Sequence, residues 1–218
     1  MLTLEKAQRV SLTTQVEMRL KGALIVGALK PGARLVTKDI AAQLGTSITP
    51  VREALLRLVS SGALDATPAQ AFQVPRLPQA RFQEITAIRK NLEGMAVREA
   101  CRSINSEQIE VLRHLVEAYR HARQSGVVES VLQANRALRF RLYGFAHLPT
   151  LTEMIEQLWV RIGPNFHFLY PAARELVGDY ESYGSLLEML ATRNELEAER
   201  IIHRMIDLGA EMITRQHY

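Results

Sequence analysis

Cysteine is nearly absent from this 218-residue chain, and no apolar run approaches the ~20 residues of a membrane-spanning helix. The single cysteine, Cys101, cannot form an internal disulfide, which is typical of a reducing compartment. Because it lies near the end of an apolar-periodic segment, we expect it to be buried rather than nucleophilic. The N-terminus lacks the basic and then apolar pattern of a signal peptide. We therefore expect a cytoplasmic protein with no membrane partner.

Signatures of the common enzyme classes are missing as well. The chain has no Gly-rich phosphate loop, no Ser/His/Asp or Cys/His arrangement at a supporting spacing, and no metal signature. None of the six histidines forms an i, i+4 pair with another histidine, so each is expected on the surface or in the core. The sequence thus predicts no catalytic residues. Turnover of a small acid is the observation that would favour an enzyme.

Positive charge is concentrated in the first third of the chain. Residues 1–77 contain ten Lys and Arg against five acidic residues, whereas the remainder contains seventeen against eighteen. The excess therefore lies where one part of the molecule would meet a polyanion. A basic face in contact with solvent alone would give the same distribution, so charge does not decide between the two.

Three helices and a β-hairpin are predicted within residues 1–77. The first helix ends at a turn containing Pro31 and Gly32, and a short second helix ends at Gly45, which suits a left-handed C-cap. The stretch TSITPVREALLRL follows at once, so the second and third helices meet at the steep angle of a helix-turn-helix. Beyond it, the segments ALDAT and AFQVP predict a small hairpin.

The third helix has one apolar face and one polar end. Val51, Leu55 and Leu58 fall at i, i+4 and i+7, a stripe that must pack against the rest of the domain. Ser47 or Thr49 is expected to cap this helix, since either side chain can accept from its free N–H groups. The polar N-terminal end points away from the stripe, as it does in a helix that enters a DNA groove.

Residues 78–218 are predicted to form an all-α bundle of about six or seven helices. Apolar residues recur at helical spacing almost throughout, and few positions favour strands. Thr150 with Glu153 and Asn194 with Glu197 have the spacing of helix caps. The predicted fold is therefore mainly α, with a winged helix-turn-helix over 1–77 and a helical domain over 78–218.

The stretch VGALKPGARLVTKDIAAQLGTSITPVREALLRLVSSGALDA resembles the winged helix-turn-helix of GntR-type bacterial transcription regulators. The shared features are a PG-x-RL turn, an LA-x-x-LG helix and a TPVREAL recognition helix. The remainder, with AIRKNLEGMAV and IEQLWVRI, resembles the FCD-type effector-binding and dimerisation domain of the FadR-like subfamily. The resemblance implies a homodimer on a palindromic double-stranded DNA operator, most often a repressor, that responds to a small-molecule effector.

The same resemblance implies which residues contact DNA. Arg52 is expected to read a guanine edge, a contact worth ~1–3 kcal/mol, while Arg34 and Lys38 grip phosphates. The alternative for Arg52 is a pair with a carboxylate such as Glu53 or Asp39. The full predicted set is Arg34, Lys38, Ser47, Ile48, Thr49, Arg52 and Gln70.

Two positions depart from the family pattern. Ile48 stands where relatives usually carry a basic residue, so contact with a thymine methyl would replace a guanine contact. Gln70 and Ala71 stand where the wing tip usually has a basic residue and a glycine, which predicts weak binding of the minor groove.

Many members of the subfamily bind a divalent metal through an Asp, a His four residues later and two further His. Alignment places Asn135, Arg139, Tyr183 and Met205 at these positions, so no metal or other cofactor is expected. Arg139, with Arg161, is instead predicted to bind the carboxylate or phosphate of an organic acid. In this interpretation Asn135 and Tyr183 supply neutral hydrogen bonds and Met205 supplies apolar wall.

Two alternatives to this effector site remain open. In the first, Arg139 pairs with an internal carboxylate such as Glu93 or Glu188 and fills the cavity. In the second, the cavity binds an acyl chain, as in the fatty-acid-responsive members of the subfamily.

Overall fold

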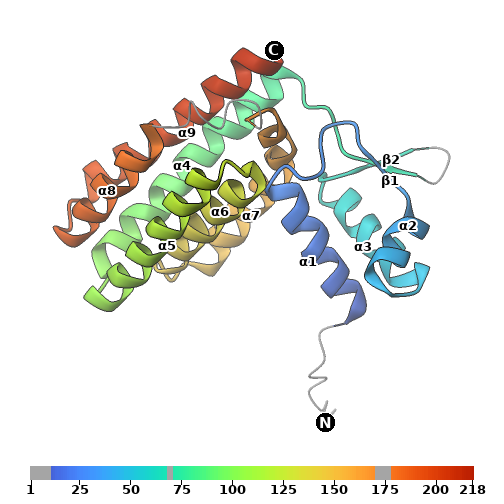
Figure 1. The fold of residues 1–218 in the computed structure, drawn as a ribbon, viewed down its shortest axis with the longest axis horizontal. Coiled ribbons are helices and arrows are strands. Elements are labelled where there is room, and N and C mark those ends of the chain that lie inside the picture. The colour runs from blue at the N-terminus through green and yellow to red at the C-terminus, as the bar shows by residue number, and fades with distance from the viewer. Residues whose placement is uncertain (1–10, 68–70, 170–177) are drawn as a thin grey trace, which may run out of the picture.

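The computed structural model describes residues 11–67, 71–169 and 178–218. The chain forms an N-terminal domain and a larger helical domain, with α1 standing between them (Figure 1). The N-terminal elements are α1 (Leu12–Ile25), β1 (Arg34–Leu35), α2 (Thr37–Leu44), α3 (Ile48–Ser60), β2 (Asp65–Ala66) and β3 (Phe72–Gln73). The helical domain contains α4 (Gln79–Ser103), α5 (Ser106–Ser125), α6 (Val128–Gly144), α7 (Pro149–Ile162), the 3-10 helix η1 (Gly163–Leu169), α8 (Gly178–Ala191) and α9 (Glu195–His217).

The helix-turn-helix forms as the apolar spacing predicts. The stripe of Val51, Leu55 and Leu58 is fully buried, and α3 packs against α1 and α2. Gly45 ends α2 with φ of 62°, a left-handed conformation that a glycine adopts without a Cβ clash. Ser47 occupies the N-cap position of α3, but its side chain makes no capping hydrogen bond, and Thr49 already lies in the first turn. The predicted capping role of these two residues is therefore wrong.

The predicted hairpin is present, and it belongs to a three-stranded antiparallel sheet with the order β1-β3-β2. Asp65 pairs with Gln73 across the hairpin, and Arg34 pairs with Gln73 from the other side. The sequence did not indicate β1 because a two-residue strand is too short to show alternation. The wing residue Gln70 lies outside the described residues.

The helical domain confirms the all-α prediction, since its described residues form six α-helices and one 3-10 helix. The long helix α4 packs against α6, α7, α8 and α9, so it is the central element. Asn194 caps α9 by accepting from the Glu197 amide, as predicted. The Thr150 cap is wrong, because α7 begins at Pro149 with Leu148 at the N-cap. Cys101 is buried, and burial raises the pKa of its thiol.

Within the part of the chain that the structure describes, every helix is too short or too polar to cross a membrane.

The two domains meet through backbone packed closely on backbone. Gly27, with φ of 67°, leaves α1 directly against η1, where a Cβ would lie 2.6 Å from the amide nitrogen of His167. On the facing side, a Cβ on Gly163 would lie 2.6 Å from the Cα of Ile25. Because real Cβ atoms do not approach this closely, both positions require glycine.

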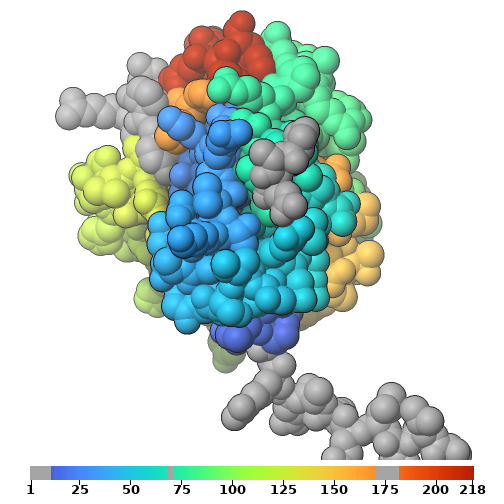
Figure 2. Space-filling view, turned by 90° about the vertical axis from the view of Figure 1, so that its right-hand side faces the viewer, coloured from blue at the N-terminus to red at the C-terminus, as the bar shows by residue number. Residues whose placement is uncertain are grey.

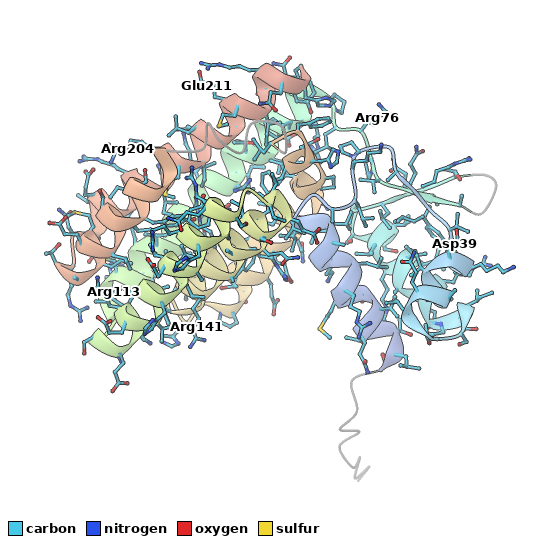
Figure 3. All side chains as sticks on the ribbon, in the orientation of Figure 1. Asp39, Arg76, Arg113, Arg141, Arg204 and Glu211 are labelled. Carbon is cyan, nitrogen blue, oxygen red and sulfur yellow. The ribbon has the colours of Figure 1, made fainter. Side chains whose placement is uncertain are left out.

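A second contact between the two domains lies at the C-terminus of α9. The Tyr218 hydroxyl donates to the Leu77 carbonyl at 2.7 Å. Arg76 lies between the sheet and this end of α9 (Figure 3), and burial together with the nearby Arg76 charge lowers the pKa of His217. The predicted boundary between residues 77 and 78 stays a prediction, because these contacts join the domains on both sides of it.

Gly163→Ala is expected to destabilise the protein by ~1–3 kcal/mol, because the added methyl group must displace the backbone of α1. Urea unfolding measures this loss. Gly144→Ala is the matched control: nothing lies within 4 Å of the added Cβ, so the stability is expected to stay the same or rise. Equal stability of the two variants would contradict the close packing at the junction.

Candidate DNA-binding surface and ligand pocket

Six of the seven predicted DNA-contacting residues are exposed on the N-terminal domain: Arg34, Lys38, Ser47, Ile48, Thr49 and Arg52. Figure 2 views the molecule from the side of this domain, where α2 and α3 occupy the front. The prediction for Gln70 is not tested, since that residue is not among those described.

A groove runs between α3 and the sheet, and it brings Lys38, Ile48 and Arg52 together. Apolar side chains flank the charges, since Ile48 is 52% exposed and Leu56 is 47% exposed. An exposed apolar residue beside a guanidinium offers both a methyl contact and a base-edge hydrogen bond. These residue types agree with the predicted contact to a DNA major groove, and the contact itself stays a prediction.

Polar side chains of α1 contact α3 and fix its orientation. Glu53 accepts a hydrogen bond from the Thr13 hydroxyl at 2.8 Å, and Arg57 pairs with Glu17 at 3.3 Å. Glu17 also pairs with Lys21 at 2.9 Å. Although partial burial would raise the pKa of Glu17, hydrogen bonds and attraction from Lys21 and Arg57 outweigh it and keep the pKa low. The orientation of α3 is thus tied to α1, which itself packs on the helical domain.

The helical domain contains a partly open cavity of about 70 Å³ between α4, α5, α6, α7, η1 and α9. Its walls are mostly apolar, with Phe82, Leu132, Trp159, Phe166 and Ile213 among the lining residues. The lining residues with hydrogen-bonding side chains include Thr86, Arg89, Tyr119, Asn135 and Arg139. An apolar cavity with a few converging polar groups is typical of a small-molecule site.

A buried carboxylate organises one end of the cavity. Glu93 is fully buried and accepts from the Arg89 Nε at 2.6 Å and the Trp159 Nε1 at 2.8 Å. It also accepts a short hydrogen bond from the Tyr143 hydroxyl, and Arg139 pairs with it at 3.6 Å. Burial would raise the pKa of Glu93, but the two guanidinium groups and these hydrogen bonds outweigh it, so the pKa lies below 4.5.

Arg139 is buried within the same cluster rather than projecting freely into the cavity. Its Nε donates to the Tyr183 hydroxyl at 2.8 Å, and its Nη1 donates to the Tyr143 hydroxyl at 3.2 Å. Tyr183 in turn donates to the Asn135 side-chain oxygen. Arg139 therefore pairs with Glu93, one of the two partners named as the alternative; Glu188 is exposed. The cavity nevertheless remains open beside it.

The four positions aligned with the metal site of relatives do come together. Asn135, Arg139 and Met205 line the cavity, and Tyr183 bonds to the first two. These residues do not fit a metal ion, because a guanidinium carries a fixed positive charge and a thioether is a poor ligand for hard cations. Within residues 11–67, 71–169 and 178–218, no three His, Cys, Asp or Glu side chains are placed to hold a metal ion.

Arg161 is not among the residues that line the cavity, so its contacts do not support the predicted role in effector binding. Its Nε and Nη2 donate to the Ser61 carbonyl at 3.1 and 2.7 Å. Ser61 is the C-cap of α3, so Arg161 binds the end of the recognition helix. Trp159 and Ile162, its near neighbours on α7, line the cavity, whereas Arg161 does not.

Arg89 is a charged cavity residue that the sequence did not lead us to predict. The side chain is nine-tenths buried, and its guanidinium carbon lies 4.7 Å from the Trp159 ring centroid. In the sequence, Arg89 and Glu93 have the i, i+4 spacing of an ordinary surface ion pair. Their positions along the helix could have revealed the burial, because both fall on the buried face of α4 that includes Phe82, Ile85 and Ala96.

The comparison with family models matches both domains. Residues 12–74 match the model "Bacterial regulatory proteins, gntR family", and residues 84–208 match the FCD domain. The regulator McbR of Escherichia coli K12 is 44% identical over 214 residues, which cover 97% of each chain. The chain belongs to the GntR family of bacterial transcription regulators.

The fold agrees with this assignment to the GntR family. The solved structure of E. coli McbR/YncC superposes with a TM-score of 0.93, covering 96% of this chain and all of the other. A GntR regulator from Rhodococcus sp. RHA1 has a TM-score of 0.78 at 21% identity, which shows the same fold. The Nta operon transcriptional regulator of Aminobacter aminovorans is 32% identical over 133 residues, 61% of this chain and 63% of its own length.

Glu93→Gln is expected to lower the stability at neutral pH by ~3–5 kcal/mol, because Arg89 and Arg139 lose the carboxylate between them. Glu110→Gln is the matched control, since Glu110 is 59% exposed and pairs only with Arg113 among the described residues. That substitution is expected to change the stability little. Urea unfolding at neutral pH makes the comparison.

Acid unfolding provides a separate check on Glu93. Because its pKa is lower in the folded chain than its ordinary value of 4.5, its ionisation stabilises the fold above about pH 4.5. This contribution is lost as the pH falls through the lower folded-state pKa. The free energy of unfolding should therefore fall less steeply with acid in Glu93→Gln than in the wild type. An unchanged slope would contradict the ionised state of Glu93.

Proposed function

We propose that this regulator binds a short palindromic operator as a homodimer and represses transcription until an organic acid occupies the helical-domain cavity. The exposed set on α2, α3 and β1 supports contact with DNA. A partial relative from Paenarthrobacter nicotinovorans, 34% identical over 124 residues, is named a probable D-xylose utilization operon transcriptional repressor. The open cavity with buried guanidinium groups supports an acidic effector.

The position of α7 and η1 between the cavity and the DNA-binding domain carries this proposal. On one side, Trp159, Ile162 and Phe166 line the cavity. On the other, Arg161 donates to the end of α3, and Gly163 packs on the backbone of α1. A ligand that moves the cavity wall would therefore also move the contacts that orient α3.

The coupling free energy that such a movement can supply is enough to regulate operator binding. Coupling between two sites is typically ~1–3 kcal/mol, which changes affinity about 5- to 150-fold. In a homodimer the same shift would act on both recognition helices, so their spacing or angle would no longer match the two halves of the operator.

Selection of duplexes from a random DNA pool is expected to yield a sequence with two-fold symmetry. Arg52→Ala should then weaken binding to the selected duplex by ~1–3 kcal/mol, because a base-edge contact is lost. Arg113→Ala is the control, since that exposed arginine lies on α5 in the helical domain. Fluorescence anisotropy measures both. A selected sequence without symmetry would contradict the dimeric site.

Arg161→Ala is expected to weaken the ligand response while the cavity stays intact. The change removes the two hydrogen bonds to the Ser61 carbonyl but no residue of the cavity lining. The probe is the acid that raises the melting temperature most in a screen of small carboxylates, sugar acids and acyl-coenzyme A compounds. We expect this acid to bind with unchanged affinity but to shift operator affinity less.

Arg200→Ala is the control for that experiment, because Arg200 pairs with Glu197 on the exposed face of α9. A full response in Arg161→Ala would show that coupling does not pass through this contact.

A further inference from the structure

We infer that the cavity binds a short-chain aliphatic monocarboxylate, and that Arg89 rather than Arg139 receives its carboxylate. This inference rests on the proposed function, because it names the class of effector for the same cavity.

The terminal nitrogens of Arg89 are the donors left for a ligand. Only its Nε donates within the described residues, to Glu93 at 2.6 Å. The two Nη groups have no hydrogen-bond partner among those residues, and neither is completely buried. Because Arg89 is one of the residues that line the cavity, we assign their accessible N–H groups to it. A guanidinium presents such N–H groups as a planar fork that matches a carboxylate.

The surroundings hold this fork in place. The Arg89 guanidinium stacks 4.7 Å from the centroid of Trp159 and 5.7 Å from that of Phe166. Its carboxylate partner, Glu93, is shared with Arg139. An incoming anion would therefore find a rigid, buried cation whose charge is compensated by a shared partner.

Arg139 is less suited to the same task. Its guanidinium is already hydrogen-bonded to Tyr183 and Tyr143 and pairs with Glu93. These contacts link α6 to α4 and α8, so Arg139 has a structural part in the domain. Asn135 keeps its side-chain oxygen for Tyr183, which leaves its NH₂ group as a second donor at the cavity.

The size of the cavity limits the rest of the ligand. A water-sized group needs about 10–15 Å³ by this measure, so about 70 Å³ holds roughly five to seven non-hydrogen atoms. A carboxylate with three to five carbons in total has roughly that number. Apolar residues such as Leu132, Met205 and Ile206 form the wall, so an alkyl chain fits and a polyhydroxy acid does not. Most of an acyl-coenzyme A compound would have to lie outside a cavity of this size.

The first experiment is a calorimetric titration of the full-length protein with straight-chain monocarboxylates from acetate to octanoate. We expect the affinity to peak near three to five carbons. The matching primary amides have nearly the same shape but no charge, and they should bind ~10-fold or more weakly because the charge-assisted hydrogen bonds are lost. Equal affinity of acid and amide, or no binding in the series, would overturn the inference.

Two variants test the assignment of the residues. Arg89→Lys keeps the positive charge beside Glu93 but removes the fork, so it should stay folded and bind the best acid at least ~10-fold more weakly. Met205→Ala removes part of the wall and enlarges the cavity, so the acid that binds best should have a longer alkyl chain. Met189→Ala is its control, because Met189 packs on the core without lining the cavity, and the preferred length should not change.

If Met205→Ala prefers the same acid length as the wild type, the inference that the ligand lies in this cavity is overturned. This test holds even if Arg89→Lys fails to fold. Operator binding, measured in the same samples, separates this inference from the proposed function. Sequence-specific DNA binding without any carboxylate binding overturns the ligand class alone. Carboxylate binding that leaves operator affinity unchanged supports the ligand class and contradicts the proposed response.

Discussion

The helical domain depends on one buried acid. Glu93 on α4 is held by Arg89 from the same helix, Tyr143 and Arg139 from α6, and Trp159 from α7. A carboxylate with no exposure to water would be strongly unfavourable alone, so this network is stable only when its partners are all present. Three helices are thereby held in one arrangement, and the guanidinium of Arg89 is fixed at the edge of the cavity.

In that arrangement, α7 and η1 contact the cavity on one side and the DNA-binding domain on the other. One surface closes the cavity with aromatic and aliphatic side chains, and the other packs on α1 and on the end of α3. Close backbone packing at Gly163 leaves no flexible side chain to absorb a displacement, because packed interiors transmit strain rather than yield to it. In the proposed response, this packing is what would carry a small change in the cavity to the helix that bears Ile48 and Arg52.

Sequence reasoning predicted which residues of the DNA-binding domain are exposed better than it predicted which arginines lie at the cavity. The residues expected to contact DNA lie within one short stretch and a neighbouring turn, so local geometry was enough to place Arg34, Lys38 and Arg52 on the exposed side. In the helical domain the four aligned positions did meet around one cavity. Arg161 was expected at the cavity because its sequence position gives its helix but not the side of the helix that faces the other domain.

The amino-acid sequence by itself determined the class of protein, the two-domain order and the polar end of the recognition helix, since apolar periodicity and turn residues act over a few positions. Only the tertiary structure decided which of the arginines Arg89, Arg139 and Arg161 faces the cavity, the buried network or the DNA-binding domain. The physical reason is that Arg139 and Arg161 are directed by partners that become neighbours only when the helices pack, namely Tyr183 with Glu93 and the Ser61 carbonyl. Arg89 pairs with Glu93 on its own helix, but its guanidinium is positioned over Trp159 of α7.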